Sequence, residues 1–171
     1  MTSFVKATTA DVPILITLGT TTFLESHGHS ASKKDIEAYI KSKFNKSAFL
    51  EALQATESHF YILYYNQIPI GYSKMVFNFP HQNIDSKNVT KLERLYLLKE
   101  FHHLKLGLEL FHFNLQVSKH HQQTGMWLYV WTENAKAISF YQKIGFKIIG
   151  SHDFKISKTH YNPNYQMLLT Y

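Results

Sequence analysis

The sequence of 171 residues contains no cysteine, which excludes disulfide bonds, thiolate metal ligands and any reaction through a cysteine-bound intermediate. Charged residues are scarce at 18%, while hydrophobic residues make up 44%, a balance typical of folded globular proteins. No apolar run approaches the length that crosses a bilayer, and the N-terminal segment lacks the basic and apolar parts of a secretory signal. We therefore expect a single cytoplasmic domain, residues 1–171, without a membrane partner.

The formal net charge of +6 favours polyanionic partners, which include nucleic acids, membranes and phosphorylated cofactors. The lysines are dispersed, however, and no run is longer than Lys33-Lys34. The aromatic residues fall in apolar strand patterns and not between basic residues on a recognisable base-stacking platform. We therefore interpret the basic charge as a solvated surface, and we expect no nucleic-acid partner.

Eleven histidines are present, and six of them form close pairs: His27 with His29, His102 with His103, and His120 with His121. Adjacent histidines on a helix point in different directions, and no carboxylate–histidine spacing resembles a zinc signature. We therefore expect no metal site.

Hydrophobic periodicity predicts a mixed α/β architecture with helices on both faces of a sheet. Asp11 is expected to cap the first helix, with Pro13 in its first turn, and Gly145 to stop the last helix. The pattern predicts, in chain order, a strand at 3–8, helices at 10–26, 32–46 and 47–55, a hairpin at 59–79, a strand at 91–98, a helix at 104–120, a strand at 126–131, a helix at 134–144 and strands at 146–150 and 165–171.

The segment after the apolar strand at 126–131 carries a specific pattern, formed by Asn134, Ala137, Phe140, Tyr141, Gly145 and Phe146. With this pattern, residues 92–147 resemble the two central motifs of the GNAT superfamily of acetyl-CoA-dependent N-acetyltransferases. The resemblance implies the GNAT fold, with a mixed sheet of about six to seven strands. It also implies acetyl-CoA as co-substrate, direct transfer of the acetyl group to an amine, and a small-molecule amine acceptor. The family is compatible with a homodimer.

The first GNAT motif departs from the family pattern of Gln/Arg-x-x-Gly-x-Gly/Ala, because His102, Lys105 and Gly107 occupy those positions. In the family, the free N–H groups at this helix N-terminus receive the cofactor pyrophosphate. We expect a lysine at position 105 only if its backbone φ is negative. The resemblance implies a cofactor site formed by Leu95, Tyr96, Leu97, His102, His103, Leu104, Lys105, Leu106, Gly107, Leu108, Asn134, Ala137 and Tyr141.

Two residues are candidates for catalysis by this resemblance. Tyr141 is placed to protonate the departing thiolate, although helical spacing alone would make it a core aromatic. Glu93 is the best-placed carboxylate for accepting the amine proton, directly or through water, and an exposed strand carboxylate is the alternative. Strand alternation predicts Glu93 and Leu95 on one face, with Arg94 and Tyr96 on the other.

The acceptor side is suggested by a weaker resemblance. Residues 21–53, with the pattern Asp35-Ile36-x-x-Tyr39-Ile40, are similar to PaiA-type spermidine/spermine N-acetyltransferases. This likeness favours a polyamine acceptor, contacted by Phe23, Glu25, His27 and Tyr39, with ordinary packing or surface positions as the alternative. Two other functions remain open: acetylation of a protein amino group, and a degenerate module that binds acyl-CoA or a partner without turnover.

The Leu97 amide is expected to polarise the acetyl carbonyl, and Asn134 either to contact the pantetheine arm or to cap its helix.

Overall fold

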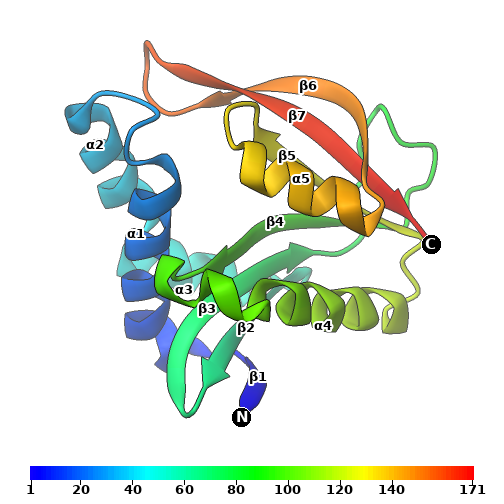
Figure 1. Ribbon diagram of the computed structural model, residues 1–171, viewed down its shortest axis with the longest axis horizontal. Helices are drawn as coiled ribbons and strands as arrows, with labels where there is room; N and C mark the ends of the chain where they lie inside the picture. The colour runs from blue at the N-terminus through cyan, green and yellow to red at the C-terminus, as the bar shows by residue number, and fades with distance from the viewer.

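The structure, a computed structural model, describes residues 1–171 and arranges them in seven strands, five α-helices and two short 3-10 helices (Figure 1). The elements are β1 (Thr2–Lys6), η1 (Thr9–Asp11), α1 (Val12–His27), α2 (Lys33–Lys43), α3 (Lys46–Gln54), β2 (Ser58–Tyr65), β3 (Ile68–Val76), β4 (Val89–Leu97), η2 (Lys99–Leu104), α4 (Leu106–His120), β5 (Gly125–Trp131), α5 (Ala135–Ile144), β6 (Lys147–Lys155) and β7 (Tyr161–Thr170).

The strands form one sheet in the order β1-β2-β3-β4-β5-β7-β6. Every neighbouring pair is antiparallel except β4 and β5, which are parallel. Parallel neighbours need a long crossover connection, and η2 and α4 supply it. The predicted mixed sheet is therefore confirmed, with seven strands.

Helices cover both faces of the sheet, as the sequence predicts, because side chains alternate along each strand. In β2, Phe60 and Ile62 join a core cluster with α1, α2 and α3, whereas Tyr61 and Leu63 lie in the clusters under α4 and α5. We call the side of the sheet that α1, α2 and α3 cover the α1 face, and the side that α4 and α5 cover the α4 face. In Figure 1, α4 and α5 lie on the near side of the sheet.

The start of α1 differs from the prediction. Asp11 precedes the helix but forms no side-chain cap to it. Its carboxylate instead accepts hydrogen bonds from the backbone N–H and the hydroxyl of Thr8, at 2.8 and 2.9 Å. These bonds close a capping box around η1, so the acidic side chain orders the turn before the helix. Pro13 lies in the first turn of α1, as expected.

The closing hairpin, β6 and β7, runs longer than predicted and reaches the connection between α1 and α2 at the upper left of Figure 1. The His160 Nε2–H donates to the Ser30 carbonyl at 2.8 Å, and the Asn162 amide donates to the Ser30 hydroxyl at 2.8 Å. On the same side, the Phe154 ring lies 6.1 Å from that of Tyr39. The last and first thirds of the chain thus meet on the α1 face. None of the helices combines the length and apolarity required to span a bilayer.

Candidate active site

The strands β4 and β5 pair over only part of their length. Three residue pairs join them, from Val89 with Gly125 to Lys91 with Trp127. Beyond this point β4 continues to Leu97 and β5 continues to Trp131, but the two strands no longer pair with each other. The two strands therefore separate and leave a gap in the centre of the sheet, which we call the central gap.

The edge of β4 along the central gap presents free backbone donors. The Leu98 N–H donates to Ile70 of β3 at 2.9 Å. Successive amides of a strand point to opposite edges, so the amides of Leu97 and Leu95 point toward the central gap. Because β5 has diverged there, no neighbouring strand accepts these bonds, and the gap can receive an extended ligand with carbonyl groups.

The helix α4 begins beside this gap, and the residue that precedes it corrects a prediction. Lys105 adopts φ 58° and ψ 13°, a left-handed conformation, whereas we expected a negative φ. The lysine thus takes the backbone shape that glycine provides more easily. A Cβ atom built on Gly107 would meet nothing within 4 Å, so the space beside the first turn is open. The unpaired N–H groups of a helix N-terminus make such a place suitable for a phosphate.

His102 does not direct its ring nitrogens toward that open space. Its Nε2–H donates to the Leu97 carbonyl at 2.9 Å, because a carbonyl oxygen can only accept. Its Nδ1 then accepts from the Lys136 ammonium of α5 at 3.0 Å. His102 thus connects β4 to α5, and it is Lys136 that brings a cation to this region, a residue that the sequence reasoning missed.

The helix α5 begins and ends as predicted, and it carries Tyr141. The Asn134 side chain accepts a hydrogen bond from the Ala137 N–H at 3.1 Å, so it caps the helix, and Gly145 ends it with φ 112°. Tyr141 packs edge-on against Phe140 and Phe146 at 5.2 and 5.4 Å between ring centroids. Burial, with a smaller contribution from nearby Tyr96 of β4, raises the pKa of Tyr141. The hydroxyl therefore stays protonated near neutral pH.

Comparison with known proteins decides the family. Residues 23–146 match the Acetyltransferase (GNAT) family. The chain belongs to the GNAT acetyltransferase family. It is 28% identical over 151 residues to an uncharacterized N-acetyltransferase of Lactobacillus delbrueckii subsp. lactis, covering 88% of this chain and 87% of the relative. It is also 28% identical over 146 residues to the spermidine N(1)-acetyltransferase of Thermoplasma acidophilum, covering 84% and 86% of the two chains.

Among solved structures, the crystal structure of the PaiA N-acetyltransferase from Thermoplasma acidophilum in complex with coenzyme A superposes with a TM-score of 0.80. The match covers 100% of this acetyltransferase and 99% of the other chain at 23% identity, a likeness that concerns the fold. The residues at the central gap fit coenzyme A as well. They offer open space at a helix N-terminus, an unpaired strand edge on β4 and a protonated tyrosine on α5.

The position of Glu93 differs from the predicted alternation, because β4 contains a bulge. Lys74 pairs with Arg94 and the next residue, Met75, with Leu92, so Glu93 is an additional residue in β4. A bulge places two successive side chains on one side of the sheet. Glu93 bonds Lys74 at 2.7 Å on the α1 face, and Arg94 lies over the Phe44 ring of the same core cluster. The expectation that Glu93 shares a face with Leu95 is wrong.

The environment of Glu93 is dominated by cations. Burial alone would raise the pKa of Glu93, but the bonded Lys74 ammonium, with Lys91 and Arg94 nearby, lowers it below its ordinary value. The side chain keeps 30% of its surface exposed, so this pairing is partly screened by solvent. Glu93 is thus held as a carboxylate in an ion pair, which makes it a weaker proton acceptor than a free one.

Lys91 lies among aromatic rings on the same face. Its ammonium is 5.0 Å from the ring centroid of Phe79, 5.3 Å from Trp127 and 5.7 Å from Tyr129. Burial lowers the pKa of Lys91, while Glu93 opposes this change. Rings at these distances attract a cation by their quadrupoles, so they hold the lysine in place.

The four predicted acceptor contacts have different surroundings. Phe23 is only 3% exposed and stacks on His27 and Tyr39, at 5.0 and 4.8 Å, so it is a core residue that supports the other two. Glu25 is exposed, but its carboxylate accepts from the Lys99 N–H at 2.9 Å and thereby fixes the start of η2. Tyr39 is partly buried between Phe23 and the closing hairpin.

The ring of His27 has a defined tautomer. The Ser26 hydroxyl donates its single proton to the Thr22 carbonyl at 2.8 Å, so its 2.7 Å contact with His27 requires Nδ1–H as the donor. Burial, with His29 as a smaller cause, lowers the pKa of His27 to about 4. The ring is therefore neutral near pH 7 and lies 5.8 Å from Trp131, at the far end of β5.

Proposed function

We propose that this acetyltransferase moves the acetyl group of acetyl-CoA directly to a primary amine, with both substrates bound together. Acetyl-CoA supplies the thioester whose carbonyl carbon is attacked. The observation that carries the proposal is the separation of β4 from β5, which leaves the Leu97 amide unpaired beside the helix that carries Tyr141. The absence of cysteine removes the most reactive covalent route and agrees with direct transfer.

Each residue of the site has a distinct part in the proposed reaction. The Leu97 N–H donates a hydrogen bond where negative charge develops on the acetyl oxygen. Tyr141 donates its proton to the departing thiolate, a role that its raised pKa supports because the hydroxyl is protonated at the working pH. Glu93 accepts the amine proton through water, since its carboxylate is already bonded to Lys74.

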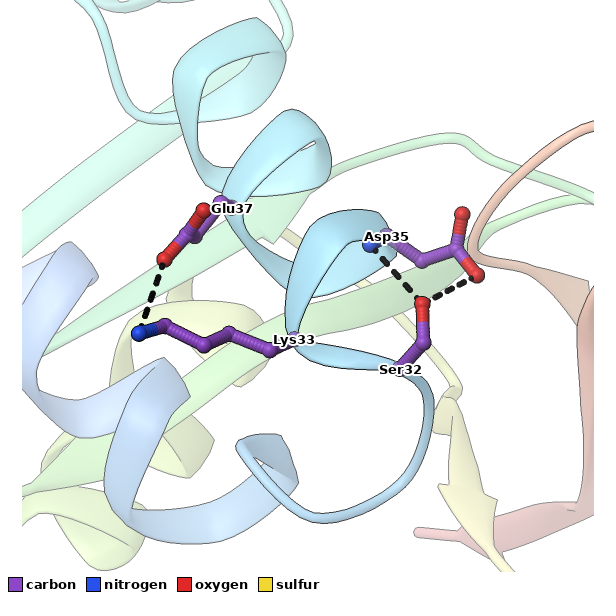
Figure 2. A network of polar contacts seen from close by, with 4 residues as sticks. All are labelled: Ser32, Lys33, Asp35 and Glu37. Carbon is purple, nitrogen blue, oxygen red and sulfur yellow. Dashed lines mark hydrogen bonds and ion pairs between the residues drawn. The ribbon is translucent and has the colours of Figure 1, made fainter.

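A polyamine is one candidate acceptor class, and it is supported by the likeness to a relative named spermidine N(1)-acetyltransferase. A cation with several ammonium groups needs carboxylates in its site. Figure 2 shows two of them in local contacts of α2: Asp35 accepts from the Ser32 hydroxyl at 2.8 Å, and Glu37 lies 3.8 Å from the Lys33 ammonium. Glu25 accepts from the Lys99 backbone N–H, and Glu93 from the Lys74 ammonium, so all four of these carboxylates have an intrachain partner.

A second acceptor class is favoured by the charges on the α1 face. Three cations, Lys74, Lys91 and Arg94, surround the single carboxylate of Glu93. A site with this balance favours an amine that also carries an anionic group over one with several ammonium groups.

Steady-state kinetics with acetyl-CoA and a panel of amines tests the proposal. The panel should contain spermidine, monoamines, amino acids and peptides with free amino groups, with release of the free thiol as the readout. Acetylation of small amines is the expected result. Acetylation of peptides alone would instead support the protein amino group as acceptor. Thermal protection by acetyl-CoA without turnover of any amine would identify a binding module and refute the enzyme proposal.

A further inference from the structure

Arg94 is the single arginine of the chain, and its guanidinium forms no ion pair. The two ion pairs of the protein join Lys33 to Glu37 and Lys74 to Glu93, and neither involves the guanidinium. Its Cζ atom lies 4.9 Å from the ring centroid of Phe44 and 5.6 Å from that of Phe49. A guanidinium has five N–H donors, so a largely buried one without an anion is an unusual arrangement.

The tyrosines near Arg94 cannot neutralise it. Burial raises the pKa of Tyr39, Tyr72 and Tyr96, although the Arg94 charge opposes that change in each. All three are therefore neutral phenols at physiological pH. Glu93 is therefore the one anionic neighbour that acts on Arg94, and its carboxylate is bonded to Lys74.

Arg94 also remains open to a ligand. The residue is partly exposed. The buried side-chain polar atoms that lack a hydrogen-bond partner belong to Ser58, His59, Tyr72 and Gln166, and none belongs to Arg94. The rings of Phe44 and Phe49 hold the flat guanidinium in one orientation, which reduces the ordering needed on binding. A guanidinium that is fixed and still partly exposed suits the two oxygens of a carboxylate.

We propose that Arg94 binds a carboxylate of the acceptor, so that the acceptor is an amino carboxylate and not a polyamine. This inference rests on the proposed acetyl transfer. Arg94 lies three residues before Leu97, whose amide points toward the central gap. A carboxylate held at Arg94 therefore places the rest of a small molecule along β4. Lys74 and Lys91 add positive potential to the same face, which also opposes binding of a molecule with several ammonium groups.

Paired acceptors that differ only in the carboxylate give the decisive test. Ornithine is compared with 1,4-diaminobutane and lysine with 1,5-diaminopentane, at saturating acetyl-CoA. We expect kcat/KM to favour the amino acid by roughly 10- to 100-fold, because a charge-assisted hydrogen bond contributes about that factor. Comparison of β-alanine with O-phosphoethanolamine separates a carboxylate from a phosphate, and we expect β-alanine to be preferred.

Variants at Arg94 connect that preference to this side chain. Arg94→Met keeps a stem that packs on Phe44 and Phe49, and it should abolish the preference by raising KM for the amino acids alone. Arg94→Lys keeps the charge without the planar fork and should retain part of it. Lys147→Met is the matched control, since it removes one exposed positive charge from β6 and should change neither substrate ratio.

A binding measurement keeps the inference testable without turnover. Butyrate, a carboxylate that has no amine, should raise the thermal midpoint of the wild type but not of Arg94→Met, relative to the same concentration of chloride. Such protection without acetylation of any amine would support the carboxylate site and refute the proposed transfer. A preference for the diamines, or an equal preference in Arg94→Met and wild type, would overturn the inference while leaving acetyl transfer intact. Failure of butyrate to protect the wild type, with no preference in the panel, would also overturn it.

Discussion

Replacing Lys105 by glycine is expected to stabilise the protein. At φ 58°, Lys105 has a conformation that costs a residue with a Cβ atom about 1–2 kcal/mol. Glycine adopts this conformation without that strain, but it loses more backbone freedom on folding, which offsets about 0.4–1 kcal/mol. The net effect is a gain of about 0.5–1 kcal/mol in the free energy of unfolding. For a chain of this size, the thermal midpoint should rise by roughly 1–4 °C in scanning calorimetry.

Lys105→Ala is the matched control, because it removes the same charge and keeps the Cβ atom. Its thermal midpoint should not rise. Titration with acetyl-CoA then reports on the Lys105 side chain. An equal loss of acetyl-CoA affinity in both variants would identify the ammonium as a phosphate contact. Unchanged affinity in both variants would mean that the amides of α4 bind the phosphate without it. A thermal midpoint for Lys105→Gly at or below that of Lys105→Ala would refute the assignment of backbone strain to this position.

Three further predictions concern single side chains. Tyr141→Phe should lower kcat by roughly 10²–10⁴-fold with acetyl-CoA binding unchanged, and near-full activity would make the tyrosine a packing residue. His27 has a pKa of about 4 in the folded state and 6.5 in the unfolded state. Because the unfolded chain binds the proton at the higher pH, roughly 3 kcal/mol of the free energy of unfolding is lost as the pH falls from 6.5 to 4. His27→Phe should remove that part of the acid sensitivity in urea unfolding at the two pH values, and an unchanged pH dependence would contradict the pKa. Lys136→Met should weaken acetyl-CoA binding by up to roughly 5-fold at low salt and by less at high salt. Calorimetric titration at two ionic strengths measures both effects. Equal affinity of the variant and the wild type at low salt would place the Lys136 cation away from the cofactor.

The elements could be predicted from the sequence wherever one apolar face repeats at a clear period. In α2, Ile36, Tyr39 and Ile40 lie on one stripe with Phe44 just beyond the helix, and the structure packs all four in or against the same core cluster. The closing strands were harder to delimit. β7 begins at Tyr161 and continues through Asn162, Pro163 and Asn164, and asparagine and proline are residue types depleted in strands.

The geometry of the site depends on contacts that a local pattern does not contain. The side on which Glu93 lies is decided by the register of β4 against β3, since the bulge exists only in the pairing of the two strands. Likewise, a left-handed backbone is usually signalled by glycine, and Lys105 gives no such signal. The bond between His102 and Lys136 joins residues 34 positions apart and follows from the docking of α5, not from either motif.

The short pairing between β4 and β5 also determines how the molecule can open. Its two half-sheets, β1 to β4 and β5 to β7, share only three residue pairs, and these lie at one end of the central gap. At that end the buried hydroxyls of Thr90 and Ser118 bond at 2.6 Å, and Ser118 also bonds the Tyr171 hydroxyl, so β4, α4 and the end of the chain are tied together. The paired end should therefore act as a hinge about which the half-sheets rotate. In hydrogen-exchange experiments, the amides of Met126 and Trp127 should exchange more slowly than those of Leu95 and Leu97, and a ligand in the gap should selectively slow the latter pair.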